Sequence, residues 1–170
     1  MKTMVFFAAI ILCGFGLVFP QLNPGWVVFR GASFKVEYPP NFTLRTSLVN
    51  PTFADFYISA FFISPDKNAE LYIYSFEGEG EATDIVLDTL TEVLVAKTKR
   101  VVKKPAKIIW RMTFKAKKGS YMRSYEDTEY AESGRLVFGI KYKDKKVYEK
   151  YKADYLKFKK SYAMESNIGD

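Results

Sequence analysis

Hydrophobic and polar residues alternate along much of the chain, and a period of two residues predicts β-strands. The first two predicted strands are WVVFR (26–30) and FKVEYP (34–39), which lie on either side of a Gly-Ala-Ser turn. Proline offers no backbone N–H to a strand ladder, so Pro39 and Pro40 should end the second strand. The polar residues 41–52 that follow predict a loop, with a turn at Asn50-Pro51.

The same alternation returns in DFYISAFFI (55–63) and AELYIYSF (69–76). The residues between these two segments, PDKN (65–68), have the composition of a tight turn. The two strands are therefore expected to pair antiparallel.

A different period begins near Thr83, where the apolar residues recur at the spacing of one helix face: Val86, Leu90, Val93 and Leu94. Thr83 would cap the N-terminus of such a helix, and Asp84 would place a favourable charge in its first turn. The pattern therefore predicts a helix over residues 83–100, with Pro105 in the linker that follows it.

Three further strands are predicted, at KIIWRMTFKAK (107–117), SYMRSYEDTEY (120–130) and RLVFGIKY (135–142). The turns between them contain Lys118-Gly119 and Ser133-Gly134. In the first of these strands, alternate side chains share one apolar face, namely Ile108, Trp110, Met112, Phe114 and Ala116. The opposite face is basic and carries Lys107, Arg111, Lys115 and Lys117.

The stretch KVYEKYKADYLKFKKSY (146–162) mixes six lysines with aromatic residues. The aromatic residues are spaced three or four positions apart, which places them along one side of a helix: Tyr148, Tyr151, Tyr155, Phe158 and Tyr162. A helix that covers a sheet requires this register, whereas a disordered nucleic-acid-binding arm does not. A buried aromatic face is therefore the preferred interpretation. A membrane-surface helix, which also combines aromatic and basic faces, and a nucleic-acid-binding arm are the alternatives.

The first residues have the features of a secretory signal: Lys2, an apolar run from Met4 to Val18, and a G-x-G pattern at Gly14 and Gly16. This run would span about 23 Å as a helix, less than the roughly 30 Å hydrocarbon core of a bilayer, so cleavage is favoured over a permanent anchor. We therefore expect residues 1–20 to be a signal peptide or N-terminal hydrophobic segment and residues 21–170 to form one extracytoplasmic domain.

Cys13 lies within this apolar run and raises the alternative of a bacterial lipoprotein. The preceding Leu12 is bulky, which disfavours lipidation, since the residue before a lipidated cysteine is normally small. Cleavage after Gly16 would leave a mature chain without cysteine, and the whole chain has no histidine. Disulfides, thiolate catalysis, Cys or His metal sites and imidazole base catalysis are then all excluded.

The order of the predicted elements, together with FKVEYPPNF (34–42), resembles the PsbP-like superfamily, which includes PsbP and DcrB-type envelope proteins. The resemblance covers residues 34–162. Members begin with a strand that ends in an aromatic-Pro pair, here Tyr38-Pro39, and end with a helix that finishes in Ser plus an aromatic residue, here Ser161-Tyr162.

This resemblance implies an α+β fold in which an antiparallel β-sheet is packed between helices, as an α/β/α sandwich. It also implies a module that binds other proteins and has no catalytic centre. Photosystem members are associated with metal retention through a histidine-containing site, a role that a chain without histidine does not inherit. No functional residue of the family can be transferred to this chain by motif.

Charge is segregated along the chain, which carries a net charge of +7. Residues 66–92 hold eight acidic residues and one basic residue, whereas residues 93–125 hold eleven basic residues and no acidic residue. The predicted basic docking surface consists of Lys107, Arg111, Lys115, Lys117, Arg123, Lys141 and Lys143. Such a surface would attract an acidic protein, an anionic lipid or a cell-wall polymer. The alternative is that these lysines keep strand edges soluble and are partly neutralised by the acidic segment.

No catalytic, cofactor-binding or metal-binding residues are predicted. The acidic loop EGEGE (77–81) has oxygen ligands suited to calcium, but it lacks the spacing of an EF-hand and is better explained as a solvated turn. Glu126 and Asp127 are adjacent on a predicted strand, so they should point to opposite faces and be unable to share a substrate. The sequence contains no nucleophile or phosphate-loop motif, and an enzyme is not expected.

The sequence thus predicts an exported, non-enzymatic binding or accessory module that docks on an envelope or membrane-associated protein. The alternative is a protein that binds a membrane surface or anionic lipid and is held there by an uncleaved N-terminal anchor. Nucleic acid is not an expected partner.

Overall fold

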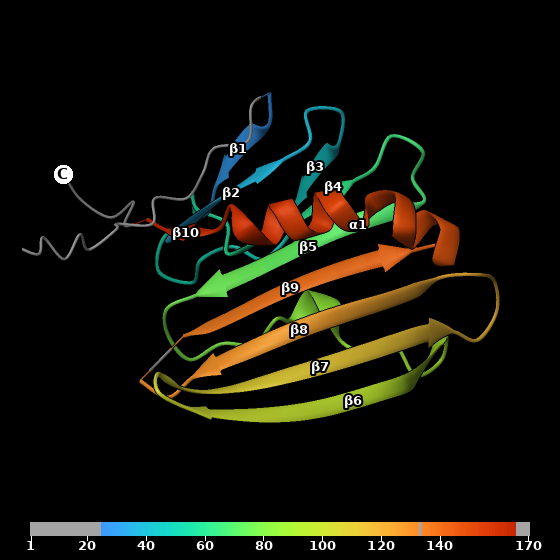
Figure 1. The fold of residues 1–170 in the computed structure, drawn as a ribbon. Helices are drawn as coiled ribbons and strands as arrows, with labels where there is room; N and C mark the ends of the chain where they lie inside the picture. Colours follow the sequence, from blue (N-terminus) through green and yellow to red (C-terminus); the bar gives the residue numbers. More distant parts are fainter. Residues whose placement is uncertain (1–24, 133, 166–170) are drawn as a thin grey trace, which may run out of the picture.

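The computed structural model of the protein describes residues 25–132 and 134–165 (Figure 1). It contains two sheets in which all strand pairs are antiparallel: a large sheet with the order β3-β4-β5-β9-β8-β7-β6 and a small one with the order β1-β2-β10. The strands are β1 (Val27–Arg30), β2 (Phe34–Tyr38), β3 (Thr43–Thr46), β4 (Ser59–Ile63), β5 (Ala69–Phe76), β6 (Glu92–Lys103), β7 (Ala106–Ala116), β8 (Met122–Tyr130), β9 (Arg135–Tyr142) and β10 (Ala163–Met164). The helices are the 3-10 helix η1 (Thr83–Ile85) and the α-helix α1 (Lys145–Lys160). The predicted signal peptide, Cys13 and Ser133 lie outside the described residues.

The large sheet is apolar on both faces of its central strands, β5 and β9. On β5, Leu71 and Ile73 belong to a first hydrophobic core, on one face of the sheet. Tyr72 and Tyr74 belong to a second core on the other face, as strand alternation requires. The second core also needs Gly139 on β9, since a Cβ there would lie 2.2 Å from the ring of Tyr125 on the paired strand. The predicted strands around these positions, including the antiparallel pair β4–β5, are confirmed.

The first core lies under α1, which crosses β5 and β9 on one face of the large sheet (Figure 1). The predicted aromatic stripe is the buried side of this helix. Tyr151 and Phe158 are buried in the first core, and Tyr148, Tyr155 and Tyr162 pack against it. Asp144 caps the helix by accepting a hydrogen bond from the backbone N–H of Val147 at 2.9 Å. The preferred interpretation of residues 146–162 is confirmed.

The two ends of the described chain meet beside this helix. Strand β10 pairs with β2, and the backbone N–H of Glu37 donates to Oγ of Ser161 at 2.8 Å. Ser161 ends α1, and Glu37 precedes Tyr38-Pro39. The two short motifs that carry the family resemblance are therefore in contact in the folded protein.

The predicted helix over residues 83–100 is wrong. Its first residues form only the short η1, and residues 92–103 form β6, an edge strand paired solely with β7 within the part of the chain that the structure describes. The apolar residues that suggested a helix face are exposed, at 66% for Val86 and 86% for Leu90. Val93, Val95, Thr98, Val101 and Val102 are β-branched and favour an extended chain.

Two further expectations need correction. Residues 41–52 are not all loop, because they include β3, which pairs with β4. The fold is α+β, but only one α-helix is present among the described residues, so the α/β/α layering implied by the resemblance is not observed there. On the face opposite α1, the second core is closed by buried Ala82 and Ile85 of the segment around η1.

Candidate docking surface

The β6–β7 hairpin forms one edge of the large sheet, away from the strands β5 and β9 that α1 covers (Figure 1). The two strands are 12 and 11 residues long and are paired along their whole length, with one irregularity between Leu94 and Ala96. All residues from Val93 to Val101 are exposed. Strand β6 therefore presents a long, accessible surface, and no other described strand pairs with its outer edge.

This hairpin is strongly basic. Residues 93–116 contain no acidic residue and eight basic ones, here called the hairpin cations: Lys97, Lys99, Arg100, Lys103, Lys104, Lys107, Arg111 and Lys115. Among the described residues only Arg111 has an ion-pair partner, Glu126, at 2.9 Å. The other seven positive charges thus have no ion-pair partner among the described residues, which creates a positive potential around this edge of the sheet.

The hairpin cations are divided between the two faces of the sheet. Strand register places Lys97, Lys99 and Lys103 on the same face as Trp110, and the Nζ atoms of Lys97 and Lys99 lie 4.7 and 4.8 Å from the centre of its ring. Arg100, Lys107, Arg111 and Lys115 lie on the face that carries α1. The positive charge therefore surrounds the hairpin and is not confined to one plane.

The structure brings together only part of the predicted basic docking surface. Lys107, Arg111 and Lys115 share the helix-side face of β7 as predicted. Lys117 lies just beyond β7, and its Nζ donates to the backbone carbonyl oxygen of Thr89 at 2.7 Å. Lys141 on β9 lies directly across from Arg123 on β8, and both are on the opposite face of the sheet. Lys143 follows the end of β9.

Sequence reasoning missed the cations of β6 because their segment was interpreted as a helix. Lys97, Lys99, Arg100 and Lys103 lie on the exposed edge strand next to Lys107 and Arg111. The signal that could have found them is the frequency of β-branched residues in VLVAKTKRVVK (93–103), which favours a strand.

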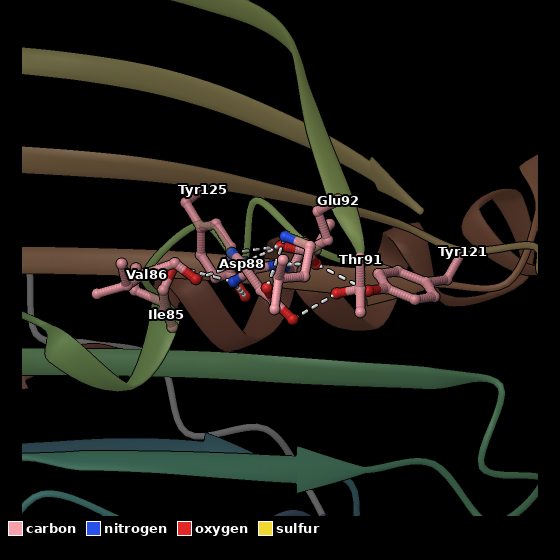
Figure 2. Close-up of polar contacts among 9 residues, drawn as sticks. Ile85, Val86, Asp88, Thr91, Glu92, Tyr121 and Tyr125 are labelled. Atoms are coloured by element: carbon pink, nitrogen blue, oxygen red, sulfur yellow. Dashed lines mark hydrogen bonds and ion pairs between the residues drawn. The ribbon is translucent and has the colours of Figure 1, made fainter. Parts of the chain in front are cut away.

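Arg123 does not belong to any exposed docking surface, because it is buried, with 7% of its surface accessible. Its guanidinium forms a bidentate ion pair with Glu92, the first residue of β6, with an Nε to Oε1 distance of 2.6 Å. It also donates to the carbonyl oxygens of Ile85 at 2.9 Å and Val86 at 2.8 Å. Figure 2 shows Glu92, Tyr121 and Tyr125 around this centre.

Arg123 and Glu92 are held in their charged forms. Burial alone would raise the pKa of Glu92, but hydrogen bonds from Arg123 and Tyr121 outweigh it and keep the pKa below its usual range. Burial likewise opposes the charge of Arg123, yet the hydrogen bond to Glu92 raises the pKa of the guanidinium. Arg123 therefore binds the segment around η1 through the carbonyl oxygens of Ile85 and Val86, and the beginning of β6 through Glu92. These contacts position the hairpin relative to the sheet.

The carboxylates considered as a catalytic pair point apart, as predicted. Glu126 faces α1, where it accepts a hydrogen bond from Nζ of Lys159 at 3.0 Å. Asp127 lies on the other face and is paired with Arg135, with an Nη2 to Oδ2 distance of 2.7 Å. In the described residues, the acidic loop and the other carboxylates do not form a group of three or more side chains arranged for a metal ion.

Comparison with solved structures identifies the fold. The structure is similar to cyanobacterial PsbP from Synechocystis, with a TM-score of 0.51, 11% sequence identity, and coverage of 89% of this chain and 96% of that one. This chain has a PsbP-like fold. A Pseudomonas aeruginosa protein of unknown function aligns over 80% of this chain and 94% of its own, with 10% identity and a TM-score of 0.35. No protein-family model and no curated protein matches the sequence.

The PsbP-like fold confirms the resemblance that the two short motifs suggested. A shared fold does not by itself give the biochemical role, which depends on the surface of this particular chain. None of the described helices is long and apolar enough to cross a membrane. The β6–β7 hairpin is the described element in which uncompensated charge is most concentrated, so it is the candidate docking surface.

Proposed function

We propose that the protein is an exported, non-enzymatic accessory module that binds an acidic region of an envelope or membrane-associated protein through its β6–β7 hairpin. The observation that carries this proposal is the set of seven hairpin cations without an ion-pair partner in the described structure. Unpaired surface charge of one sign accelerates and selects the encounter with a partner of the opposite sign. The PsbP-like fold supports an accessory role, and the predicted secretory signal supports export.

The arrangement of the cations favours a protein over a lipid surface. Lys97 and Lys99 lie on one face of the hairpin, whereas Arg111 and Lys115 lie on the other. A flat membrane can approach only one of these faces at a time. An acidic groove or an extended acidic segment on a protein can contact the edge and both faces together, so more of the charge is used.

The proposal is tested with two variants that remove the same amount of positive charge. The hairpin variant changes Lys97, Lys99, Arg100 and Lys103 to Gln. The matched helix variant changes four exposed lysines of α1 that have no ion pair among the described residues, which are Lys145, Lys146, Lys157 and Lys160. Tagged full-length chains are cross-linked in the native host, and the captured envelope proteins are quantified at low and high salt.

The hairpin variant should lose the captured partner, with association slowed about tenfold or more, while the helix variant should retain it. High salt should weaken capture by the wild-type chain. Equal capture by both variants would contradict the proposal. Intact mass of the recovered chain tests export, which predicts a chain shortened near Gly16.

Vesicles test the membrane alternative. The full-length chain is mixed with vesicles of phosphatidylcholine, with and without phosphatidylglycerol. We expect little binding to either. Strong binding to the anionic vesicles that the hairpin variant loses, together with an uncleaved chain recovered only with membranes, would replace the proposal by an anchored, lipid-facing role.

A further inference from the structure

The outer edge of β6 has no strand paired with it among the described residues, since β6 is the last strand of the large sheet. The edge between the irregularity at Leu94/Ala96 and the hairpin turn comprises residues 96–103. An edge of this kind presents a row of backbone N–H and C=O groups that can pair with another extended chain.

The hydrogen bonds at the ends of the ladder show which backbone groups face outward. The N–H of Ala131 donates to the carbonyl oxygen of Ala106 at 3.1 Å, so Ala106 directs its backbone groups toward β8. Because backbone groups alternate in direction along a strand, Lys107 directs its own toward Val102 on β6. The outward groups of β6 are therefore those of alternate residues, namely Lys97, Lys99, Val101 and Lys103.

The side chains of these outward residues also share one face. Lys97, Lys99 and Lys103 lie on the same face as Trp110, whereas Thr98, Arg100 and Val102 lie on the opposite face. A strand added to this edge would place its alternate side chains next to the three lysines. Acidic residues at those positions would form opposite-charge cross-strand pairs, which stabilise a sheet.

A second copy of this chain does not fit the same edge. Pairing of β6 with β6 would bring the lysine row of one molecule against the lysine row of the other, and like charges directly opposite one another are destabilising. Lysines on an edge strand are a common protection against such self-association. The same row that repels a second copy attracts an acidic strand.

We infer that β6 binds its partner by β-strand addition, and that the partner segment is extended and acidic, with acidic residues alternating with β-branched or small ones. The inference rests on the proposed function, because it specifies how the hairpin meets the acidic partner. Main-chain hydrogen bonds to the outward groups of β6 supply affinity, and the lysine row selects the acidic sequence.

The probe is a synthetic peptide as long as β6 that alternates Glu with Thr, and its neutral counterpart alternates Gln with Thr. Binding to the full-length protein is measured together with amide hydrogen exchange. The acidic peptide should slow exchange at the outward amides of Lys97, Lys99, Val101 and Lys103. The amides of Thr98, Arg100 and Val102 already face β7, so their exchange should change little. The neutral peptide should bind weakly.

A substitution that leaves the charge unchanged isolates the backbone contribution. Val101→Pro removes one outward N–H at a position where an edge strand tolerates proline, and Val101→Ala is the control that keeps this N–H. We expect Val101→Pro to bind the acidic peptide about tenfold more weakly than Val101→Ala, as for the loss of one or two hydrogen bonds. Circular dichroism of the two variants establishes that both are folded, and the exchange measurement on the wild-type chain needs no variant.

The outcomes separate the two proposals. If the hairpin variant loses peptide binding while Val101→Pro equals Val101→Ala and the outward amides gain no protection, strand addition is overturned and charge-driven docking stands. If the wild-type chain does not bind the peptide while the hairpin variant still loses the captured envelope partner, strand addition is likewise overturned and charge-driven docking stands. Equal capture of that partner by the hairpin and helix variants would overturn both proposals.

Discussion

Arg123 makes more hydrogen bonds through its side chain than any other basic residue in the described chain. It makes hydrogen bonds to Glu92, to two backbone carbonyl oxygens and to the Tyr125 hydroxyl, all in a buried position. A buried ion pair of this kind contributes little over an apolar pair of the same shape, but removing one partner leaves the other charge buried without compensation. The residue is thus required for stability without being accessible for binding.

Arg123→Ala should therefore lower the free energy of unfolding by about 3–5 kcal/mol, measured by chemical denaturation. Lys143→Ala is the matched control, since Lys143 is an exposed basic side chain without an ion pair among the described residues. The control should change stability by about 0.5 kcal/mol or less. A loss below about 1 kcal/mol for Arg123→Ala would show that Glu92 finds another partner or water.

At the scale of elements, α1 is held to the sheet by its aromatic side. The ring of Phe158 lies 5.2 Å from that of Phe62 on β4 and 5.7 Å from that of Phe138 on β9, both measured between ring centres. Phe158 is fully buried, whereas Leu156 on the same helix is 55% exposed. Burial of aromatic area, and not helix propensity, is therefore what holds this element in place.

Phe158→Ala should destabilise the protein by about 3–5 kcal/mol, because it removes a large buried side chain and leaves a cavity. Leu156→Ala should cost about 0.5 kcal/mol or less, as for an exposed position. Thermal unfolding followed by circular dichroism measures both variants. Similar losses for the two substitutions would mean that the packing of α1 differs from that described.

At the scale of the whole molecule, the acidic and basic segments that follow one another in sequence form few ion pairs with each other. Of the acidic residues in 66–92, only Glu92 forms an ion pair with a basic residue of 93–125 among the described residues. Asp66 pairs with Lys150 on α1, and Glu70 pairs with Arg45 on β3. Apart from Arg111, the hairpin cations therefore have no ion-pair partner among the described residues.

The pH dependence of stability follows from the ionisable groups of the whole molecule. Ion-pairing hydrogen bonds lower the pKa of Asp66, Glu92 and Glu126 even though burial opposes this. A carboxyl group with a lowered pKa in the folded protein stabilises it above the pKa of the unfolded chain, about 4.5 for Glu, and this stabilisation is lost as the pH falls. Burial raises the pKa of Asp154, which opposes the trend.

We expect the free energy of unfolding to be nearly constant between about pH 6 and 8, where histidine normally titrates, because the chain has no histidine. The free energy of unfolding should decrease as the pH is lowered below about 4.5. It should fall again above about pH 10, since burial raises the pKa of Tyr125 to about 12 and only the unfolded chain would then ionise this residue. Urea denaturation across this range measures the profile, and a transition near pH 6.5 would contradict it.

Sequence reasoning was sufficient for the α+β class, for most strands and for the buried side of α1. Strand alternation and helical spacing are local patterns, and in these segments each pattern agreed with the burial that the fold imposes. The separation of Glu126 and Asp127 followed from the same local geometry.

The tertiary structure alone decided the state of residues 83–103 and the roles of the basic residues. Val86 and Leu90 fit a helix face in sequence, but burial of Ile85 and the pairing of β6 with β7 leave them exposed between η1 and β6. Arg123 and Lys107 look alike in the sequence, yet the fold places Arg123 in a buried ion pair and Lys107 on the hairpin at the edge of the sheet, without an ion pair among the described residues. Periodicity records only neighbours along the chain, whereas strand pairing and charge compensation depend on residues distant in sequence.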